Sequence, residues 1–84
     1  MKKTTVTPAD IGKIVRAARK DAGLRQHELA GAAAVGLRFI VDLEAGKPTA
    51  QVGKVLQVLA ALGCSVEIVP PTGSRRDGTG RRPR

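Results

Sequence analysis

The first third of the chain alternates apolar and polar residues at the spacing of an amphipathic helix. Thr7 is a suitable N-cap, Pro8 takes the first helical position, where a missing N–H costs nothing, and Asp10 favours the positive helix end. Gly23 suits the left-handed residue that ends such a helix. A helix is therefore predicted between these signals. Its inward face is predicted to hold Ile11, Ile14, Val15, Ala18 and Ala22.

Two short helices are predicted next, with a tight turn at residues 34–36 between them. The first covers residues 26–33, and the second runs from residue 37 to about residue 45 and ends at Gly46. Their inward residues are predicted to be Leu29, Ala30, Ala33, Ile40 and Leu43.

A fourth helix is predicted over residues 50–62, with Thr49 as its N-cap and Gly63 closing it. Gly53 weakens this helix by about 1 kcal/mol relative to alanine. The apolar stripe is predicted to be Val52, Val55, Leu56, Leu59 and Leu62.

After this helix the period changes to that of a strand. Cys64, Val66 and Ile68 occupy alternate positions, between a glycine and a Pro-Pro pair. A lone strand leaves its backbone N–H and C=O groups unpaired, so we expect it to pair antiparallel with its copy in a homodimer. Residues 72–84 hold no large apolar side chain, and we expect a disordered basic tail there.

Charge narrows the class of partner. The chain carries 15 Lys and Arg against 7 Asp and Glu, a formal net charge of +8. Residues 1–71 hold ten of these basic and six of these acidic residues, which gives +4 without the tail. A balance this basic favours a polyanionic partner, because neutralising phosphates releases condensed counterions. The composition also allows an alternative, in which the basic residues form a solvated surface and a tail that binds anions non-specifically.

The inventory of reactive side chains argues against an enzyme. Cys64 is the single cysteine and His27 the single histidine, so neither an intrachain disulfide nor a zinc site is expected. No phosphate-binding loop and no nucleophile with a matched base is present, and we expect no cofactor. No apolar run is long enough to span a bilayer or serve as a signal peptide, which favours the cytoplasm.

The spacing within residues 26–43 fits a helix-turn-helix. Ala30 supplies the small residue that a steep helix crossing needs, and Val35 fills the space between the two helices. Over about residues 8–63 the chain resembles the lambda-repressor-like, Xre-type helix-turn-helix family. The family pattern is roughly TQxELAxxAGVSxxxIxxIExGKxxP, and the chain reads RQHELAGAAAVGLRFIVDLEAGKPTA. The matching residues are Gln26, Glu28, Leu29, Ala30, Val35, Ile40, Glu44, Gly46 and Lys47.

Three positions depart from the pattern. Arg25 replaces the usual Thr cap, Ala34 stands where the turn usually has glycine, and Gly36 replaces a Ser before the third helix. The lost cap costs around 1 kcal/mol, and a left-handed Ala34 would be mildly strained, whereas glycine is an accepted N-cap.

In the resembled family the start of the third helix faces the major groove, which implies base contacts from this chain. Arg38 is the strongest candidate, because a guanidinium can bond O6 and N7 of guanine together; a solvated cation is the alternative. Leu37 suits a thymine methyl, and Asp42 either accepts from cytosine N4 or repels phosphate. The residues expected to contact DNA are Arg25, Gln26, Gly36, Leu37, Arg38, Val41, Asp42 and Lys47.

Two further side chains receive structural interpretations. Glu44 is expected to pair with an arginine of the domain, for which Arg16 is predicted, while Arg19 is placed with the polar faces of its helix. Phe39 either packs in the core or at its edge, or lies exposed to a partner. The cations interpreted as plain surface residues are Lys13, Arg16 and Lys54.

A narrower resemblance concerns the end of the chain. The stretch GKPTAQVGKVLQVLAALG, followed by CSVEIV and a loose tail, is similar to HipB-type antitoxins. That similarity implies a repressor of its own operon that binds a HipA-type kinase toxin. A standalone regulator, and an antitoxin that does not bind DNA, remain as alternatives.

Together these observations predict an all-α, lambda-repressor-like helix-turn-helix bundle of four to five short helices, with one C-terminal β-strand that pairs between subunits. The dimer is expected to bind a palindromic operator in double-stranded DNA and to form through Cys64, Val66 and Ile68. The predicted divisions are a flexible arm at 1–6, the DNA-binding domain at 7–63, the dimerisation strand at 64–71 and the tail at 72–84.

Overall fold

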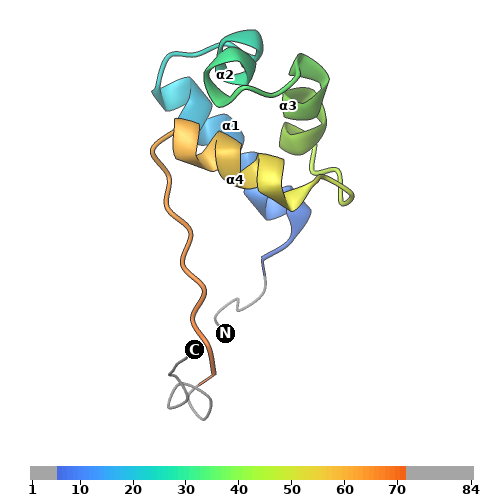
Figure 1. Ribbon diagram of the computed structural model, residues 1–84, viewed down its shortest axis with the longest axis vertical. Helices are drawn as coiled ribbons and strands as arrows, with labels where there is room; N and C mark the ends of the chain where they lie inside the picture. Colours follow the sequence, from blue (N-terminus) through green and yellow to red (C-terminus); the bar gives the residue numbers. More distant parts are fainter. Residues whose placement is uncertain (1–5, 72–84) are drawn as a thin grey trace.

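A computed structural model describes residues 6–71 and places within them four helices, which confirms the predicted all-α helix-turn-helix bundle (Figure 1). Helices α1 and α2 both pack against α3, and α4 packs against α2. Most of the predicted arm and the whole predicted tail lie outside the described residues. The helices are α1 Pro8–Asp21, α2 Gln26–Ala33, α3 Leu37–Glu44 and α4 Val52–Ala61.

Helix α1 begins and ends at the predicted signals. The Thr7 N–H donates to the Asp10 carboxylate at 3.0 Å, and the Asp10 N–H donates to the Thr7 hydroxyl at 3.1 Å, which forms a capping box. At the other end Gly23 has φ of +74°, and the Leu24 N–H reaches the Arg19 carbonyl oxygen at 3.1 Å. This bond folds half-buried Leu24 back over the last turn of α1.

The turn between α2 and α3 keeps its shape without the usual glycine. Ala34 adopts a left-handed conformation with φ of 60° and ψ of 41°, as the resemblance implied. The Val35 N–H then donates to the Ala30 carbonyl oxygen at 3.0 Å, and Gly36 is the N-cap of α3. Arg25 is the N-cap of α2, and its N–H donates to the Glu28 carboxylate at 2.7 Å. This bond offsets part of the loss of the Thr cap.

Helix α4 differs from its prediction at its start and in its buried face. It begins at Val52 with Gln51 as N-cap, because Thr49, the predicted N-cap, forms a turn with Pro48 instead. Val52 is 72% exposed and Leu56 47% exposed, so their predicted inward placement is wrong. Val58, which the stripe omitted, is fully buried, along with buried Val55 and Leu59.

The core is built from small aliphatic residues of all four helices. The five inward residues predicted for α2 and α3 are all buried, as is Val15 of α1. Ile14 is 54% exposed and Ala22 is also exposed, so both were wrongly placed inward. Gln57 of α4 donates from Nε2 to the Ala33 carbonyl oxygen at 3.1 Å and so ties α4 to the end of α2. The buried hydrophobic residues are Val15, Leu29, Ala30, Ala33, Ile40, Leu43, Val55, Val58 and Leu59.

Gly12 lets α1 and α3 approach closely. A Cβ atom at this position would lie 2.5 Å from the Leu43 carbonyl oxygen and 2.9 Å from that of Glu44. Real Cβ atoms do not tolerate such distances, so the crossing requires glycine. The last turn of α3 therefore rests directly on the backbone of α1.

The segment at 64–71 follows α4 as an extended stretch that runs away from the helices (Figure 1). Within the described chain it forms no β-strand. A β-strand that pairs between subunits can form only when a second copy of the chain is present, so the dimerisation strand stays a prediction.

Candidate nucleic-acid interface

Helix α3 separates its residues cleanly into an inner and an outer face. Ile40 and Leu43 are 0% and 3% exposed, whereas the Arg38 side chain is 84% exposed. Because an α-helix has 3.6 residues per turn, Arg38 lies on the same side of α3 as Val41 and Asp42, away from the core. Leu37 is about half-exposed at the start of the helix. The residues predicted to read bases therefore share one outward face, and Gly36 begins the helix that carries them.

Asp42 joins two of the predicted DNA-contact residues. Its Oδ1 lies 3.2 Å from the Arg38 Nε, and its Oδ2 lies 3.5 Å from the Lys47 Nζ. The Asp42 side chain is 23% exposed, compared with 54% for Lys47. The carboxylate is thus paired with one cation at each oxygen, an arrangement that the sequence analysis did not foresee.

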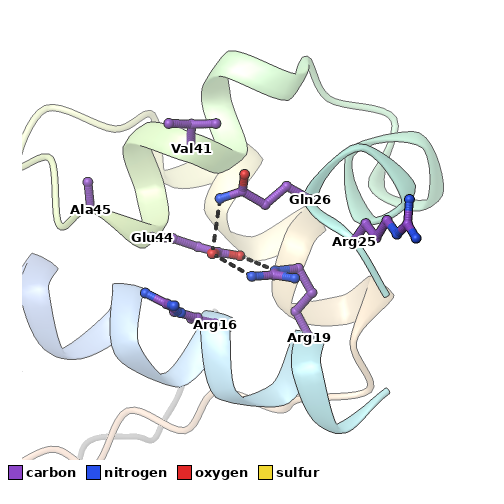
Figure 2. A pocket seen from close by; sticks show the side chains of 7 residues that line it. All are labelled: Arg16, Arg19, Arg25, Gln26, Val41, Glu44 and Ala45. Atoms are coloured by element: carbon purple, nitrogen blue, oxygen red, sulfur yellow. Dashed lines mark hydrogen bonds and ion pairs between the residues drawn. The ribbon is translucent and has the colours of Figure 1, made fainter. Parts of the chain in front are cut away.

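A basic hollow of about 470 Å³ opens on one side of α3, where α1 and the start of α2 meet it. Figure 2 shows Arg16 on α1 and Arg25 at the start of α2 at its sides, with Glu44 and Arg19 at its base. We call this site the α2 hollow. It is lined by Arg16, Arg19, Arg25, Gln26, Val41, Glu44 and Ala45.

The base of the α2 hollow is a hydrogen-bonded ion pair. Arg19 donates from Nε to Glu44 Oε2 at 2.6 Å, from Nη2 to Oε1 at 3.1 Å, and from Nη1 to the Leu24 carbonyl oxygen at 2.8 Å. The side chains of Arg19 and Glu44 are 10% and 5% exposed. Gln26 adds a bond from Nε2 to Glu44 Oε1 at 3.3 Å (Figure 2). The hydrogen bonding that Arg19 donates to Glu44 raises the pKa of Arg19, so the guanidinium stays charged.

This geometry corrects two expectations. The partner of Glu44 is Arg19 and not Arg16, and Arg19 is buried instead of facing solvent. Arg19 lies nearly one turn beyond Arg16 along α1, and its guanidinium meets the Glu44 carboxylate. Arg16 stays exposed, with its guanidinium at the edge of the α2 hollow (Figure 2).

A second basic hollow, of about 210 Å³, lies on the opposite side of α3, towards the start of α4. The N-cap Gln51 makes no side-chain hydrogen bond to the first turn of α4, so N–H groups there are open to an anion. Lys54 stands 5.9 Å from the centroid of the Phe39 ring. We call this site the α4 hollow. It is lined by Phe39, Asp42, Lys47, Thr49, Ala50, Gln51 and Lys54.

The α4 hollow contains residues that sequence reasoning missed or left open. Phe39 is half-buried against the core, which favours the edge-packing interpretation. Gln51 was missed because the predicted helix began too early; the Pro48-Thr49 pair was the signal for a turn there. Lys54 was interpreted as a surface cation, and it lines this hollow together with Lys47.

An apolar groove of about 440 Å³ runs between α1 and the extended segment after α4. The three predicted dimerisation residues all line it: Cys64 is half-buried, Val66 is 55% exposed and Ile68 is 87% exposed. We call this site the apolar groove. Its lining residues are Val6, Ile11, Ile14, Leu59, Cys64, Ser65, Val66, Glu67 and Ile68.

Within residues 6–71 no three potential metal ligands gather at one place. In the same part of the chain, no helix has both the length and the apolar character that a membrane span requires.

Comparisons with known proteins agree with this geometry. The helix-turn-helix family matches residues 15–69, which is more than half of the chain. A protein of Sinorhizobium fredii, named "Uncharacterized HTH-type transcriptional regulator y4mF", is 70% identical over 76 residues, covering 90% of this chain and 99% of the relative.

Two solved structures share the fold at 17% sequence identity, each covering 82% of this chain and 97% of its own. One is described as "HipB-O4 20mer complex" and has a TM-score of 0.71; the other, "MDT Protein", has a TM-score of 0.72. The family match, the close relative and the outward face of α3 lead to one conclusion. The chain belongs to the helix-turn-helix family of DNA-binding transcriptional regulators.

Proposed function

We propose that this protein is a sequence-specific repressor that binds a palindromic operator as a homodimer, with α3 in the major groove. The observation that carries the proposal is the position of Arg38, 84% exposed on α3 between two basic hollows. An outward arginine with cations on both sides suits a groove whose base edges lie between two phosphate backbones. Leu37 and Val41 complete the reading face, and Gly36 brings the backbone near the bases.

The two hollows are assigned to the two DNA strands. Arg25 and Gln26 begin α2 beside the α2 hollow, with Arg16 on its other side. Lys47 and Lys54 line the α4 hollow, next to the open start of α4. Such contacts fix the register of the protein on DNA without reading its sequence, and they make binding salt-dependent.

The apolar groove is assigned to the dimer. Val66 and Ile68 expose most of their surface, together with Ile14 of α1. Pairing the segment at 64–71 with its copy would form a two-stranded antiparallel ladder and would cover these side chains. A two-fold axis there would set the two α3 helices about one DNA turn apart, roughly 34 Å.

The finer assignment is that the protein is a type II antitoxin of the HipB kind, which represses its own operon in the cytoplasm and binds a HipA-type kinase toxin. Similarity of fold to HipB and the sequence after α4 support it. Co-purification with the product of a neighbouring kinase gene is the test. If the adjacent genes encode no such kinase, the protein is instead a standalone regulator.

DNA binding is tested by titrating fluorescent DNA from upstream of the chain's own gene and following its anisotropy. Arg38→Ala should weaken specific binding by about 1–3 kcal/mol and relax the preference at one base pair in each half-site. Arg38→Lys is the matched control, because it keeps the charge but loses the planar fork, and so should retain non-specific binding. Wild-type affinity in Arg38→Ala would show that α3 does not read this DNA.

A further inference from the structure

Asp42 stands at the centre of the proposed reading face, and neither a repulsive role nor a base-reading role explains its contacts. It lies one turn after Arg38 on α3, at the i,i+4 spacing that brings side chains together. Its two oxygens are divided between two cations, Oδ1 with Arg38 and Oδ2 with Lys47. A carboxylate that only repelled phosphate would have no need of either contact.

The contact with Arg38 leaves the useful edge of the guanidinium open. The atom nearest to Asp42 is Nε, at 3.2 Å. The two Nη groups, which form the planar fork that matches O6 and N7 of guanine, are at the far end of the side chain. With 84% of its surface exposed, this side chain would otherwise sample many rotamers. A neighbouring carboxylate restricts that freedom before DNA arrives.

The contact with Lys47 extends the same restraint to the loop after α3. Lys47 follows the C-terminal end of α3 and lines the α4 hollow. Its Nζ is 3.5 Å from Asp42 Oδ2, and its N–H donates to the Asp42 carbonyl oxygen at 3.0 Å. One residue therefore holds both the arginine proposed to read a base and a lysine proposed to contact phosphate.

We propose that Asp42 is a positioning residue, which sets the base preference of this protein by orienting Arg38 end-on towards a guanine and holding Lys47 at the adjacent phosphate. The inference rests on the proposed function, since it specifies how the same face reads DNA. Asp42 then lowers the affinity of the protein for all DNA, because it brings a negative charge near phosphates. It also increases the preference for guanine at the base pair that Arg38 contacts.

The test measures charge and orientation separately. Asp42→Ala, Asp42→Asn and wild type are each titrated with four versions of an operator, one for each base at the position where Arg38→Ala relaxes the preference. Both variants lose the negative charge, so both should bind unrelated DNA more tightly, by several-fold at low salt. Asp42→Ala should also lose roughly two- to tenfold of the guanine preference, whereas Asp42→Asn keeps a polar side chain of the same size beside Nε and should retain part of it.

Two controls assign the effect. Asp21→Ala removes the same charge at the end of α1 and should leave the base preference unchanged. In an Arg38→Ala background, Asp42→Ala should cause no further change at that base pair, since the residue to be positioned is gone. Thermal unfolding followed by circular dichroism shows whether each variant keeps its fold.

Several outcomes would overturn the inference. If Asp42→Ala tightens binding to all four versions equally, Asp42 only repels phosphate. If the preference changes at a different base pair, and does so in the Arg38→Ala background too, Asp42 reads a base itself. If the proposed function itself is wrong, the result differs from all of these, because the wild-type protein would then show no preference for any DNA sequence.

Discussion

Removing the Glu44 carboxylate should strongly destabilise the protein, because it leaves a buried guanidinium without its counter-ion. Arg19 is 10% exposed, and two of its three hydrogen bonds end on Glu44. Breaking a buried ion pair by deleting one partner costs about 3–5 kcal/mol. The lower end applies, since Arg19 keeps the Leu24 carbonyl oxygen and the α2 hollow admits some water.

Glu44→Ala is therefore expected to lower the free energy of unfolding by about 3 kcal/mol. In a domain of this size, that corresponds to a decrease in Tm of roughly 12–24 °C. Urea unfolding at 25 °C, followed by the helical circular dichroism signal, measures the free energy directly. The paired replacement Arg19→Met with Glu44→Leu removes both charges and should recover most of the loss, since no charge is then left unpaired.

A Glu44→Ala variant that loses less than about 1 kcal/mol would refute the reasoning, because that is the value of an exposed pair. The pH dependence gives a second check. The raised pKa of Arg19 means that its stabilising contribution is complete below the ordinary arginine pKa and is lost only above it. Arg19 therefore stays charged between pH 6 and pH 9, and its ionisation should not change the loss of unfolding free energy caused by Glu44→Ala in this range.

Three other variants test the fold and the dimer. Gly12→Ala should destabilise by about 1–3 kcal/mol in urea unfolding, because its Cβ would meet the Leu43 carbonyl oxygen, whereas Gly31→Ala, with no atom within 4 Å, should be neutral or stabilising. Ala34→Gly should raise the free energy of unfolding by up to about 1 kcal/mol by relieving a left-handed alanine; a loss would contradict this. Val66→Pro should remove a backbone N–H that would donate to the paired strand, and sedimentation should then show more monomer. An unchanged dimer would reject the interface at 64–71.

The helix-turn-helix could be predicted from the sequence because strong local signals bound it. Helix α2 begins and ends where predicted, since the turn at 34–36 fixes its end and Gln26 directly follows an extended N-cap. Helix α4 was harder to orient. Apolar residues cover more than half of its circumference, so periodicity alone could not choose Val58 over Leu56 for the core.

Within the site, the outer face of α3 could be predicted from the spacing of Ile40 and Leu43, but the ion pairs of α3 could not. The backbone of Glu44 lies over Gly12, which is nearer along α1 to Arg16 than to Arg19, so the choice of Arg19 depends on the direction in which the Glu44 side chain runs along α1. The α4 hollow depends on a turn at Pro48 and Thr49, where Thr49 had been predicted to cap the helix. These features arise from contacts between elements, which local patterns do not encode.

The close approach at Gly12 has a consequence for how this protein can change its target. The carbonyl groups of Leu43 and Glu44 rest on α1 with no side chain between them, so α3 is anchored at its last turn. Leu37 and Arg38, two of the side chains proposed to read DNA, project from its first turn, away from that anchor. Substitutions at Leu37 and Arg38 can therefore alter operator choice without loosening the bundle. Mutation can then divert such a regulator to a new operator in single steps, each of which yields a folded protein.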